Sequence, residues 1–461
     1  MKFIGSNLVL AMALIAVSNS LPNPDENCDA LTNLAVDAGV FAVTFFYMTH
    51  PVYRAIMGNG NAGNGAPGWN KLEHNLKPSG PEVIAGSPNA DVTYSSIWYD
   101  LHEGPIVTTI PAFNGRFYTF QWTDAEGNTI AALSPRNDKN NTITRAIITM
   151  DPSFESNSSD TIVVKSYSRL AWGVFRFLPN GTSEDLLLVN NLQRSVSAQP
   201  LIGTITSAST SHPEFTSDLF ENGKFAPASK LFEVLGWQMK VNGIQLAEQE
   251  PFNKFAPLGL TKDGYNPGTC QRKLLTSLIP KIFSDVKAAD TNGVGQARNN
   301  GWVYDANSSL PYPENSFLQK AVVAFMGTVA NRIEEVIYFR RSFDSTNTML
   351  DGSKYSYTVR FETQPPVNGY WSLTAYNHTT KLIQENPYKI YSVGSHKGTL
   401  MYDVNGGVQL YLSVNSPSDP KMLNNWLPIP NGEFDLMIRT YWPTPELISQ
   451  EYLMPNVVKT N

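Results

Sequence analysis

Three residues in the N-terminal half of the chain carry the groups that acid–base chemistry requires. His74 offers a titratable imidazole, Asp91 a carboxylate and Arg116 a fixed cation. Asp91 follows Pro88 and Asn89, a turn sequence, and turns on a rigid sheet are where binding residues collect. In this interpretation His74 or Asp91 acts as the acid or base and Arg116 clamps an anion. If Asp91 faces Arg116, the pKa of Asp91 falls and His74 becomes the acid/base; if the two are apart, Asp91 is the base itself.

The alternative is structural: Asp91 caps a turn, and Arg116 closes a salt bridge at a strand end. Further polar candidates lie in the same half of the chain, namely Asn89, Tyr94, Asp100 and Asp124. A second, aromatic group follows near the C-terminus, namely Trp371, Asn425, Trp426, Arg439 and Trp442. This second group could face a sugar or a lipid, or it could form the core and rim of a β-sandwich. Its arginine could clamp a carboxylate or close a structural salt bridge.

The sequence lacks the motifs of a histidine metal site and of a serine hydrolase. The six histidines are scattered, without His-x-His or His-Glu-x-x-His, and there is no Gly-x-Ser-x-Gly elbow. We therefore expect neither a transition-metal site nor a cofactor, while a calcium site built from Asp and Asn loops stays open. The net charge of −6 provides no basic field for phosphates, so we expect no nucleic-acid partner. No feature of the sequence points to a particular oligomeric state.

The elements that must position these residues are mainly strands. Residues 93–101, 106–110 and 117–122 are rich in β-branched and aromatic side chains and predict a three-strand meander. Further strands are expected at 143–150, 161–166, 170–177, 355–361, 369–376, 398–402, 408–414 and 434–441, with Gly and Pro turns between them. Apolar residues at helical spacing predict helices over 29–48, 186–196, 231–246, 274–286 and 317–337. Pro51 should end the first of these helices, and Pro280 should kink or divide the fourth.

These elements predict a mainly β chain with a helical insertion. We expect a signal peptide over 1–20, an N-terminal helix and a Gly/Asn-rich loop over 21–76, and a β-sandwich domain over 77–205. A helical domain over 206–310 and a second β domain over 311–461 follow. The first 20 residues have a lysine near their start, an apolar run over 8–17 and small residues after it, as secretory signal peptides do; an uncleaved anchor is the alternative.

Two further features are typical of a secreted glycoprotein. Five Asn-x-Ser/Thr sites are predicted to carry glycans, at Asn140, Asn157, Asn180, Asn307 and Asn377. Cys28 and Cys270 are the two cysteines, and in an oxidising compartment they have one intramolecular pairing available. Two unrelated buried thiols are the competing interpretation. The expected location is extracellular, without stable insertion into a membrane.

The motifs around the turn resemble a two-domain family of unknown function, DUF1254 followed by DUF1214. The N-terminal resemblance rests on Asn70, His74, Pro88-Asn89, Asp91, Tyr94, Asp100-Leu101 and Arg116-Phe117-Tyr118, with Phe117 in place of a family tyrosine. The C-terminal resemblance rests on residues 366–374, 386–387, 391–394, 425–428 and 439–443. The resemblance implies an N-terminal immunoglobulin-like sandwich, a small helical domain and a C-terminal jelly roll. The family carries no assigned activity.

Two hypotheses about function follow. In the first, the protein is a secreted, glycosylated, non-catalytic β-sandwich protein that binds a partner, a glycan or a matrix component. In the second, it is a cofactor-independent enzyme acting on a small or glycan-like substrate, with His74, Asp91 and Arg116 as its site. A cleft that joins these three residues favours the enzyme, whereas a sealed salt bridge favours binding or structure. The absence of a catalytic motif favours the first.

Overall fold

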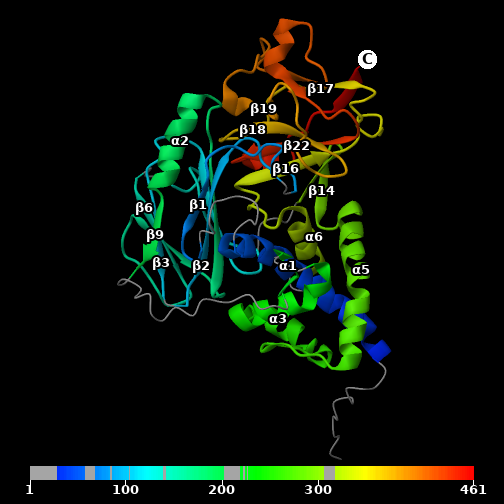
Figure 1. Ribbon diagram of the computed structural model, residues 1–461. Coiled ribbons are helices and arrows are strands. Elements are labelled where there is room, and N and C mark those ends of the chain that lie inside the picture. Colours follow the sequence, from blue (N-terminus) through cyan, green and yellow to red (C-terminus); the bar gives the residue numbers. More distant parts are fainter. Residues whose placement is uncertain are drawn as a thin grey trace, which may run out of the picture.

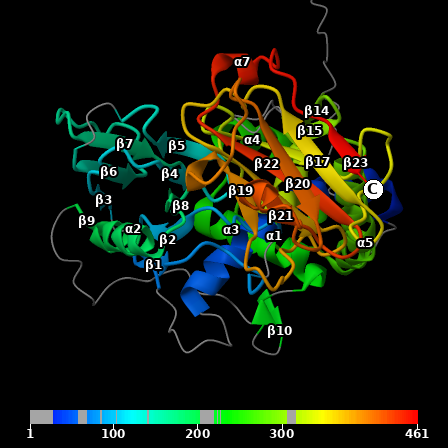
Figure 2. The same cartoon turned by 90° about the horizontal axis from the view of Figure 1, so that it is seen from above.

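The computed structural model describes residues 28–57, 68–83, 86–102, 104–138, 142–201, 219–221, 224–225, 227–305 and 317–460. The expected signal peptide and the glycosylation sites Asn140 and Asn307 lie outside these residues. The described chain is mainly β, with several sheets and a group of helices. Figure 1 shows the first β domain at the left, the second β domain at the upper right and most of the helices beneath the second. Figure 2 shows from above that the two β domains lie side by side.

The first β domain contains two sheets that share one hydrophobic core. One sheet has the order β1-β2-β8-β4-β5 and the other β7-β6-β3-β9. The elements are β1 (Leu72–Asn75), β2 (Thr93–Asp100), β3 (Ile106–Ile110), β4 (Tyr118–Thr123), β5 (Thr129–Leu133), β6 (Thr144–Thr149), β7 (Thr161–Lys165), β8 (Leu170–Phe177), α2 (Ser183–Ser195) and β9 (Ser197–Pro200). Alternate residues of both sheets, such as Phe120 of β4 and Ile148 of β6, enter the same core.

The predicted meander is wrong, although its strands are correctly placed. β2 and β4 pair with opposite edges of β8, and β3 belongs to the second sheet, where it pairs with β6 and β9. The chain therefore crosses between sheets twice over this stretch. Polar residues near the ends of these strands are consequently carried to different sites. β1 also extends the first sheet, so that this domain begins before residue 77.

The helices form a separate core. They are α1 (Thr32–Met57), α3 (Leu231–Asn242), α4 (Leu246–Asn253), α5 (Thr269–Thr291) and α6 (Phe317–Gly327), with short strand pairs β10 (Phe220–Glu221) with β11 (Lys224–Phe225) and β12 (Leu260–Thr261) with β13 (Gly264–Tyr265). α1 packs against α3, α5 and α6. It approaches α5 so closely that a Cβ on Gly39 would lie 2.1 Å from Cδ1 of Ile282. Pro51 lies inside α1 and does not end it, contrary to expectation, because the surrounding packing outweighs the lost hydrogen bonds. Pro280 lies inside α5 and does not divide it.

The N-terminal helix is a core helix that is joined covalently to α5. In the described chain, Cys28–Ile56 is long and apolar enough to cross a membrane, yet more than half of its most apolar window is buried inside the protein. Cys28, in the 3-10 helix η1 (Cys28–Leu31), forms a disulfide with Cys270 at the start of α5. Their Cα atoms are 6.0 Å apart, an ordinary separation for this bond. The predicted bridge is thus present.

The second β domain also contains two sheets around one core. Their orders are β14-β15-β16-β22-β18-β19 and β21-β20-β17-β23. The elements are β14 (Gln296–Asn299), β15 (Trp302–Asp305), β16 (Val336–Arg341), β17 (Ser356–Phe361), β18 (Trp371–Asn377), β19 (Ser392–Gly394), β20 (Val408–Ser413), β21 (Trp426–Pro428), β22 (Phe434–Tyr441), α7 (Pro445–Ile448) and β23 (Val457–Thr460). The β14–β15 hairpin lies in this domain, although the sequence analysis assigned its residues to the helical domain over 206–310. The helix expected over 317–337 ends at Gly327, and no strand forms over 398–402.

Candidate functional site: a pocket beside the joint of the two β domains

The turn at residues 87–91 docks on one face of the second domain's larger sheet. β18 and β22 are antiparallel neighbours in which Ser372 pairs with Arg439. Because side chains alternate along a strand, Trp371 points into the domain's core while Ser372 points toward the first domain. This second face carries the residues that bind the turn. We call the contact region the joint; it comprises Asn89, Asp91, Ser372, Tyr376, Arg439 and Tyr441.

Arg439 holds the turn by its backbone. Its Nη2 donates to the carbonyl oxygens of Ser87 at 3.0 Å and Pro88 at 3.4 Å, and to the Tyr376 hydroxyl at 2.6 Å. The Tyr376 hydroxyl in turn donates to Pro88 O at 2.7 Å. Asn89 Nδ2 donates to the hydroxyl of Tyr441 at 2.6 Å. The two signature regions of the sequence, more than 300 residues apart, therefore bind each other.

Asp91 is sealed within the joint and 2% exposed. Its Oδ2 accepts a hydrogen bond from Ser372 Oγ at 2.5 Å, and its Oδ1 lies 3.6 Å from Nε2 of His396. Burial raises the pKa of Asp91, but the charges of His396 and Arg439 and the hydroxyls of Ser372 and Ser392 together lower it below its ordinary value. Asp91 is therefore ionised at neutral pH, with Arg439 as the permanent cation nearby.

The other two members of the predicted cluster lie elsewhere. His74 sits on β1 opposite Ser95 of β2, and its Nδ1 is 2.8 Å from Ser95 Oγ. Arg116 forms a two-pronged ion pair with Asp185 of α2, at 2.5 and 2.9 Å. Of the two alternatives that the sequence left open, Asp91 and Arg116 are therefore apart, each with a different partner. The physical reason is the sheet topology, which separates the strands that carry these residues.

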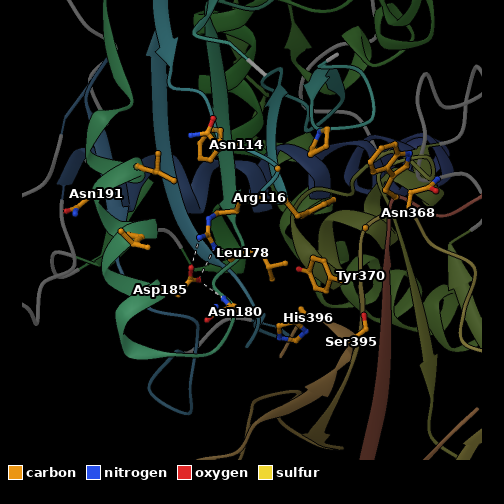
Figure 3. Close-up of a pocket in the computed structure, with 18 residues that line it drawn as sticks. Asn114, Arg116, Leu178, Asn180, Asp185, Asn191, Asn368, Tyr370, Ser395 and His396 are labelled. Carbon is orange, nitrogen blue, oxygen red and sulfur yellow. Dashed lines mark hydrogen bonds and ion pairs between the residues drawn. The ribbon is translucent and has the colours of Figure 1, made fainter. Parts of the chain in front are cut away.

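A pocket of about 930 Å³ lies next to the joint, between the two β domains. One wall comes from the first domain, through the turn at residues 113–117, the segment that enters α2, and α2 itself. The other wall comes from the second domain (Figure 3). The lining residues are Phe113, Asn114, Gly115, Arg116, Phe117, Pro135, Leu178, Asn180, Asp185, Leu188, Asn191, Leu192, Asn368, Gly369, Tyr370, Ser395, His396 and Trp442. Its volume is that of an ordinary small-molecule site.

Local backbone geometry shapes both walls. Asn114 and Gly115 have φ values of 50° and 81°, and Arg116 N–H donates to Phe113 O at 3.1 Å, which closes a tight turn. On the opposite wall Trp442 has φ 53°, a region that bulky residues avoid. Hydrogen bonds of 2.8 Å from Trp442 N–H to Glu335 O and from Asn368 N–H to Trp442 O hold this conformation. Such strain concentrates at functional sites.

The pocket is polar but carries no unpaired charge among the side chains that line it. The carboxylate of Asp185 neutralises Arg116, which also donates to Leu178 O at 2.7 Å. Arg116 lowers the pKa of Asp185, so both members stay charged and paired. His396 is held neutral, because burial lowers its pKa to about 4. Arg116 is consequently committed to its partner and is not the anion clamp that the sequence predicted.

Two buried polar atoms beside the pocket have no hydrogen-bond partner in the described chain: the hydroxyl of Tyr370 and Nδ1 of His396. The ring of Tyr370 stacks on Tyr441 at 4.1 Å between centroids and lies 5.1 Å from the ring of His396. In Figure 3 the Tyr370 hydroxyl points toward the side of the pocket where Leu178 and Arg116 lie. In the tautomer that places its proton on Nε2, toward Asp91, His396 Nδ1 is an acceptor. A donor and an acceptor thus stand together.

The other residues that the sequence analysis proposed for binding, apart from Trp442 and those of the joint, lie outside the pocket lining and make contacts within the fold. Trp371 is 1% exposed in the second core, and Trp426 donates from Nε1 to Ser413 Oγ at 2.9 Å. Tyr94 lies beneath the guanidinium of Arg176, 5.6 Å from it. Asp100 pairs with Arg169. Asp124 accepts hydrogen bonds from Asn128, and burial together with Glu126 raises its pKa to about 7.

Sequence reasoning missed most of the pocket. Tyr370 and Asn368 belong to the C-terminal stretch that resembles the family, and the sequence marks Asn180 only as a glycosylation site. His396 and Ser395 lie in the 3-10 helix η5 (Ser395–Lys397) and have no local pattern that marks them. Within the described residues no group of three or more His, Cys, Asp or Glu side chains is arranged to hold a metal ion.

Comparison with known proteins agrees with the two-domain arrangement. The family model described as "Protein of unknown function (DUF1254)" matches residues 69–200, and "Protein of unknown function (DUF1214)" matches residues 335–445. No curated protein matches the chain. The crystal structure of the VPA0106 protein from Vibrio parahaemolyticus is similar, with a TM-score of 0.70 and 19% identity over 93% of this chain and 100% of that one. A putative uncharacterized protein from Burkholderia cenocepacia gives a TM-score of 0.46 and 11% identity over 94% and 96%. The chain therefore belongs to the two-domain family of unknown function that carries DUF1254 followed by DUF1214.

Proposed function

We propose that the protein is a secreted glycoprotein that binds a small, uncharged, hydroxyl-bearing ligand, such as a short glycan, in the pocket between its β domains. The observation that carries this proposal is the pocket of about 930 Å³, in which the charged side chains are paired and beside which the Tyr370 hydroxyl and His396 Nδ1 are buried. The proposal keeps the immunoglobulin-like and jelly-roll assignments that the family resemblance implies. It also keeps the expectation that neither nucleic acid nor a membrane is a partner.

The lining suits a ligand with both apolar and hydroxyl faces. Aromatic rings from Phe113, Phe117 and Trp442 offer flat surfaces that pack on the C–H face of a sugar ring. Amides of Asn191 and Asn368 offer a donor and an acceptor each. A charged ligand would have to displace the Arg116–Asp185 pair, since no other cation or anion among the lining side chains is free to receive it.

The test is a binding screen with matched neutral and charged sugars. Purified protein is titrated calorimetrically with neutral mono- and disaccharides and with the corresponding uronic acids. We expect a neutral sugar to bind and its acidic counterpart to bind more weakly. Tyr370→Phe should weaken binding by roughly tenfold, because one hydrogen bond of about 1.4 kcal/mol is lost.

The matched control is Tyr402→Phe, which removes the hydroxyl of an exposed tyrosine that does not line the pocket. This control should bind as the unmodified protein does. Failure of every neutral sugar to bind, or equal affinity of Tyr370→Phe and the unmodified protein, would reject the proposal. Secretion is checked separately by mass spectrometry of the exported protein, whose N-terminus should lie close to Leu21.

A second candidate function, acid–base catalysis on the same class of ligand, is favoured by the contact between Asp91 and His396. Nδ1 of His396 would accept a proton from a ligand hydroxyl, and the buried carboxylate of Asp91 would stabilise the resulting imidazolium. The pKa of about 4 makes His396 a weak base at neutral pH, so binding is the better-supported function. His396→Gln should abolish turnover of a bound sugar, if turnover occurs, while leaving its binding measurable.

A further inference from the structure

One predicted glycosylation site lines the pocket. Asn180, of the sequence Asn180-Gly181-Thr182, lies in the segment between β8 and α2, is exposed, and belongs to the pocket's lining residues. Asn157 and Asn377 are the other two sites that the structure describes, and neither lines the pocket. Asn180 is labelled in Figure 3, next to Asp185 and on the wall of the first domain.

Local hydrogen bonds fix how the Asn180 side chain is presented. Its Oδ1 accepts from both N–H and Oγ1 of Thr182, each at 3.0 Å. Its backbone N–H donates to Asp185 Oδ2 at 2.7 Å, and Thr182 caps α2 by accepting from Asp185 N–H at 3.2 Å. The carboxamide oxygen is therefore held toward the helix, and no described residue bonds Nδ2. Nδ2 is the atom to which an N-linked glycan is attached.

The two domains approach each other at this point. A Cβ placed on Gly181 would lie 3.6 Å from Cγ of Lys397, in the 3-10 helix that also carries Ser395 and His396. Gly181 has φ 94°, a conformation that favours glycine, and it keeps this corner narrow. A glycan on Asn180 would thus begin at a corner of the pocket where the two domains lie close to each other.

We propose that Asn180 carries an N-linked glycan that stands over the mouth of the pocket and restricts entry to small ligands. The inference rests on the proposed secretion and glycosylation and deepens the proposed binding function, because it assigns the pocket a size filter. Because the sugar chain is covalently attached at the rim, it stays there and excludes bulky molecules from the pocket at all times. Small neutral sugars pass beside it.

The first part of the test is site occupancy. Glycopeptide mass spectrometry of the secreted protein should find an N-linked glycan on the peptide that contains Asn180. Thr182→Ser preserves the glycosylation sequence and a capping hydroxyl and should keep the glycan. Asn180→Gln and Thr182→Asp should each lose it, the second while retaining a capping oxygen. An unmodified Asn180 in protein whose Asn157 is modified would overturn the inference and leave the binding proposal standing. A protein with no glycan at any site would remove the proposed glycosylation itself and this inference with it.

The second part measures access to the pocket with an introduced thiol. Cys28 and Cys270 are bonded to each other, so a single new cysteine is the one free thiol of the protein. Leu188 lines the pocket and is 59% exposed, while its neighbour Leu187 is 65% exposed and does not line it. Leu188→Cys and Leu187→Cys therefore form a matched pair.

Both cysteine variants are reacted with N-ethylmaleimide and with a bulky poly(ethylene glycol) maleimide. With the glycan present, the bulky reagent should label Leu188→Cys several-fold more slowly than it does in the Asn180→Gln background. N-ethylmaleimide should react with Leu188→Cys at the same rate in the two backgrounds. Leu187→Cys should react with either reagent at a rate that does not depend on the Asn180 glycan. Asn157→Gln serves as the control for loss of a remote glycan and should leave all rates unchanged. Equal rates of the bulky reagent at Leu188→Cys with and without the Asn180 glycan would overturn the size filter.

Discussion

The joint and the pocket lie side by side between the same two β domains, yet they are built in opposite ways. In the joint, Asp91 and Arg439 are each 2% exposed, and Nη2 of Arg439 donates to two carbonyl oxygens of the turn. In the pocket, the equivalent pair of Arg116 and Asp185 has side chains that are 20% and 10% exposed, beside an open volume of about 930 Å³. The joint holds the domains together, and the pocket is the space left beside it.

The difference shows what the signature motif does. Asn89 and Asp91, the residues whose pattern suggested chemistry, are used to attach the first domain to the second. Tyr370 and His396 connect the two regions, because they line the pocket and also contact the joint, through Tyr441 and Asp91 respectively. These two pocket-lining side chains are thus supported by the joint.

The largest expected effect is the loss of Arg439. Arg439→Met should lower the free energy of unfolding by about 3–5 kcal/mol, because it leaves the carboxylate of Asp91 and two turn carbonyls buried without their cation. Urea unfolding measures this change. Lys281→Met, which breaks an exposed ion pair with Asp285 on α5, is the control and should cost less than about 1 kcal/mol. Equal costs would show that the joint is no stronger than a surface contact.

A pH dependence should follow from His396. Its pKa is about 4 in the folded protein and 6.5 in the unfolded chain, so the unfolded chain binds its proton first as the pH falls. The contribution of His396 to the free energy of unfolding is complete above pH 6.5 and is lost as the pH falls to 4. This contribution amounts to about 3 kcal/mol. His50 of α1 has the same pKa and adds to the slope. Asp91, whose pKa is also lowered, contributes in the same sense, but only below the ordinary aspartate range.

Unfolding measured between pH 7 and pH 4 tests this. The slope should be smaller in His396→Gln and also in His50→Gln, and smallest in the double variant, since the two residues are independent. Lys397, Tyr370 and Asp91 face His396 and are left unchanged. A slope that His396→Gln leaves intact would mean that the imidazole is not buried in neutral form.

The ion pair of the pocket should matter less than the arginine of the joint. Arg116→Met should destabilise the protein by about 1–2 kcal/mol, because its pair is partly exposed and its hydrogen bonds are partly replaced by water. The cost should largely disappear when Asp185 is already Asn, which a double-mutant cycle measures. A cost as large as that of Arg439→Met would make the pocket part of the structural joint.

The smallest effect on stability is expected for Tyr370. Tyr370→Phe should change the free energy of unfolding by less than about 0.5 kcal/mol, because its hydroxyl has no partner to lose. Tyr376→Phe is the matched comparison on the same face and should cost about 1–3 kcal/mol, since its hydroxyl bonds Pro88 O and Arg439. Thermal unfolding measures the stability of both variants. A Tyr370→Phe protein that keeps its stability but loses affinity would show that this hydroxyl contacts the ligand and does not support the fold.

Local patterns predicted much of the fold. β-branched and aromatic runs placed the longer strands of both β domains except β16 and missed most of the short ones, while helical spacing placed every α-helix of more than ten residues. The two cysteines allowed a single bridge, which is present. Pro51 misled the boundary of the first helix, because the packing of α1 compensates for the hydrogen bond that this proline removes. Pairing of strands was not predictable from runs alone, and the meander failed for that reason.

The sequence by itself determined the family, the turn at residues 87–91 and the residue types that this turn needs. Only the tertiary structure decided the partners of that turn, because Arg439 and Ser372 reach it from strands more than 280 residues away in the chain. The same holds for the pocket, whose walls come from two domains and whose lining side chains have no shared spacing. Hydrogen bonds and burial act through space, and a motif indicates that a polar group must be satisfied without naming the group that satisfies it.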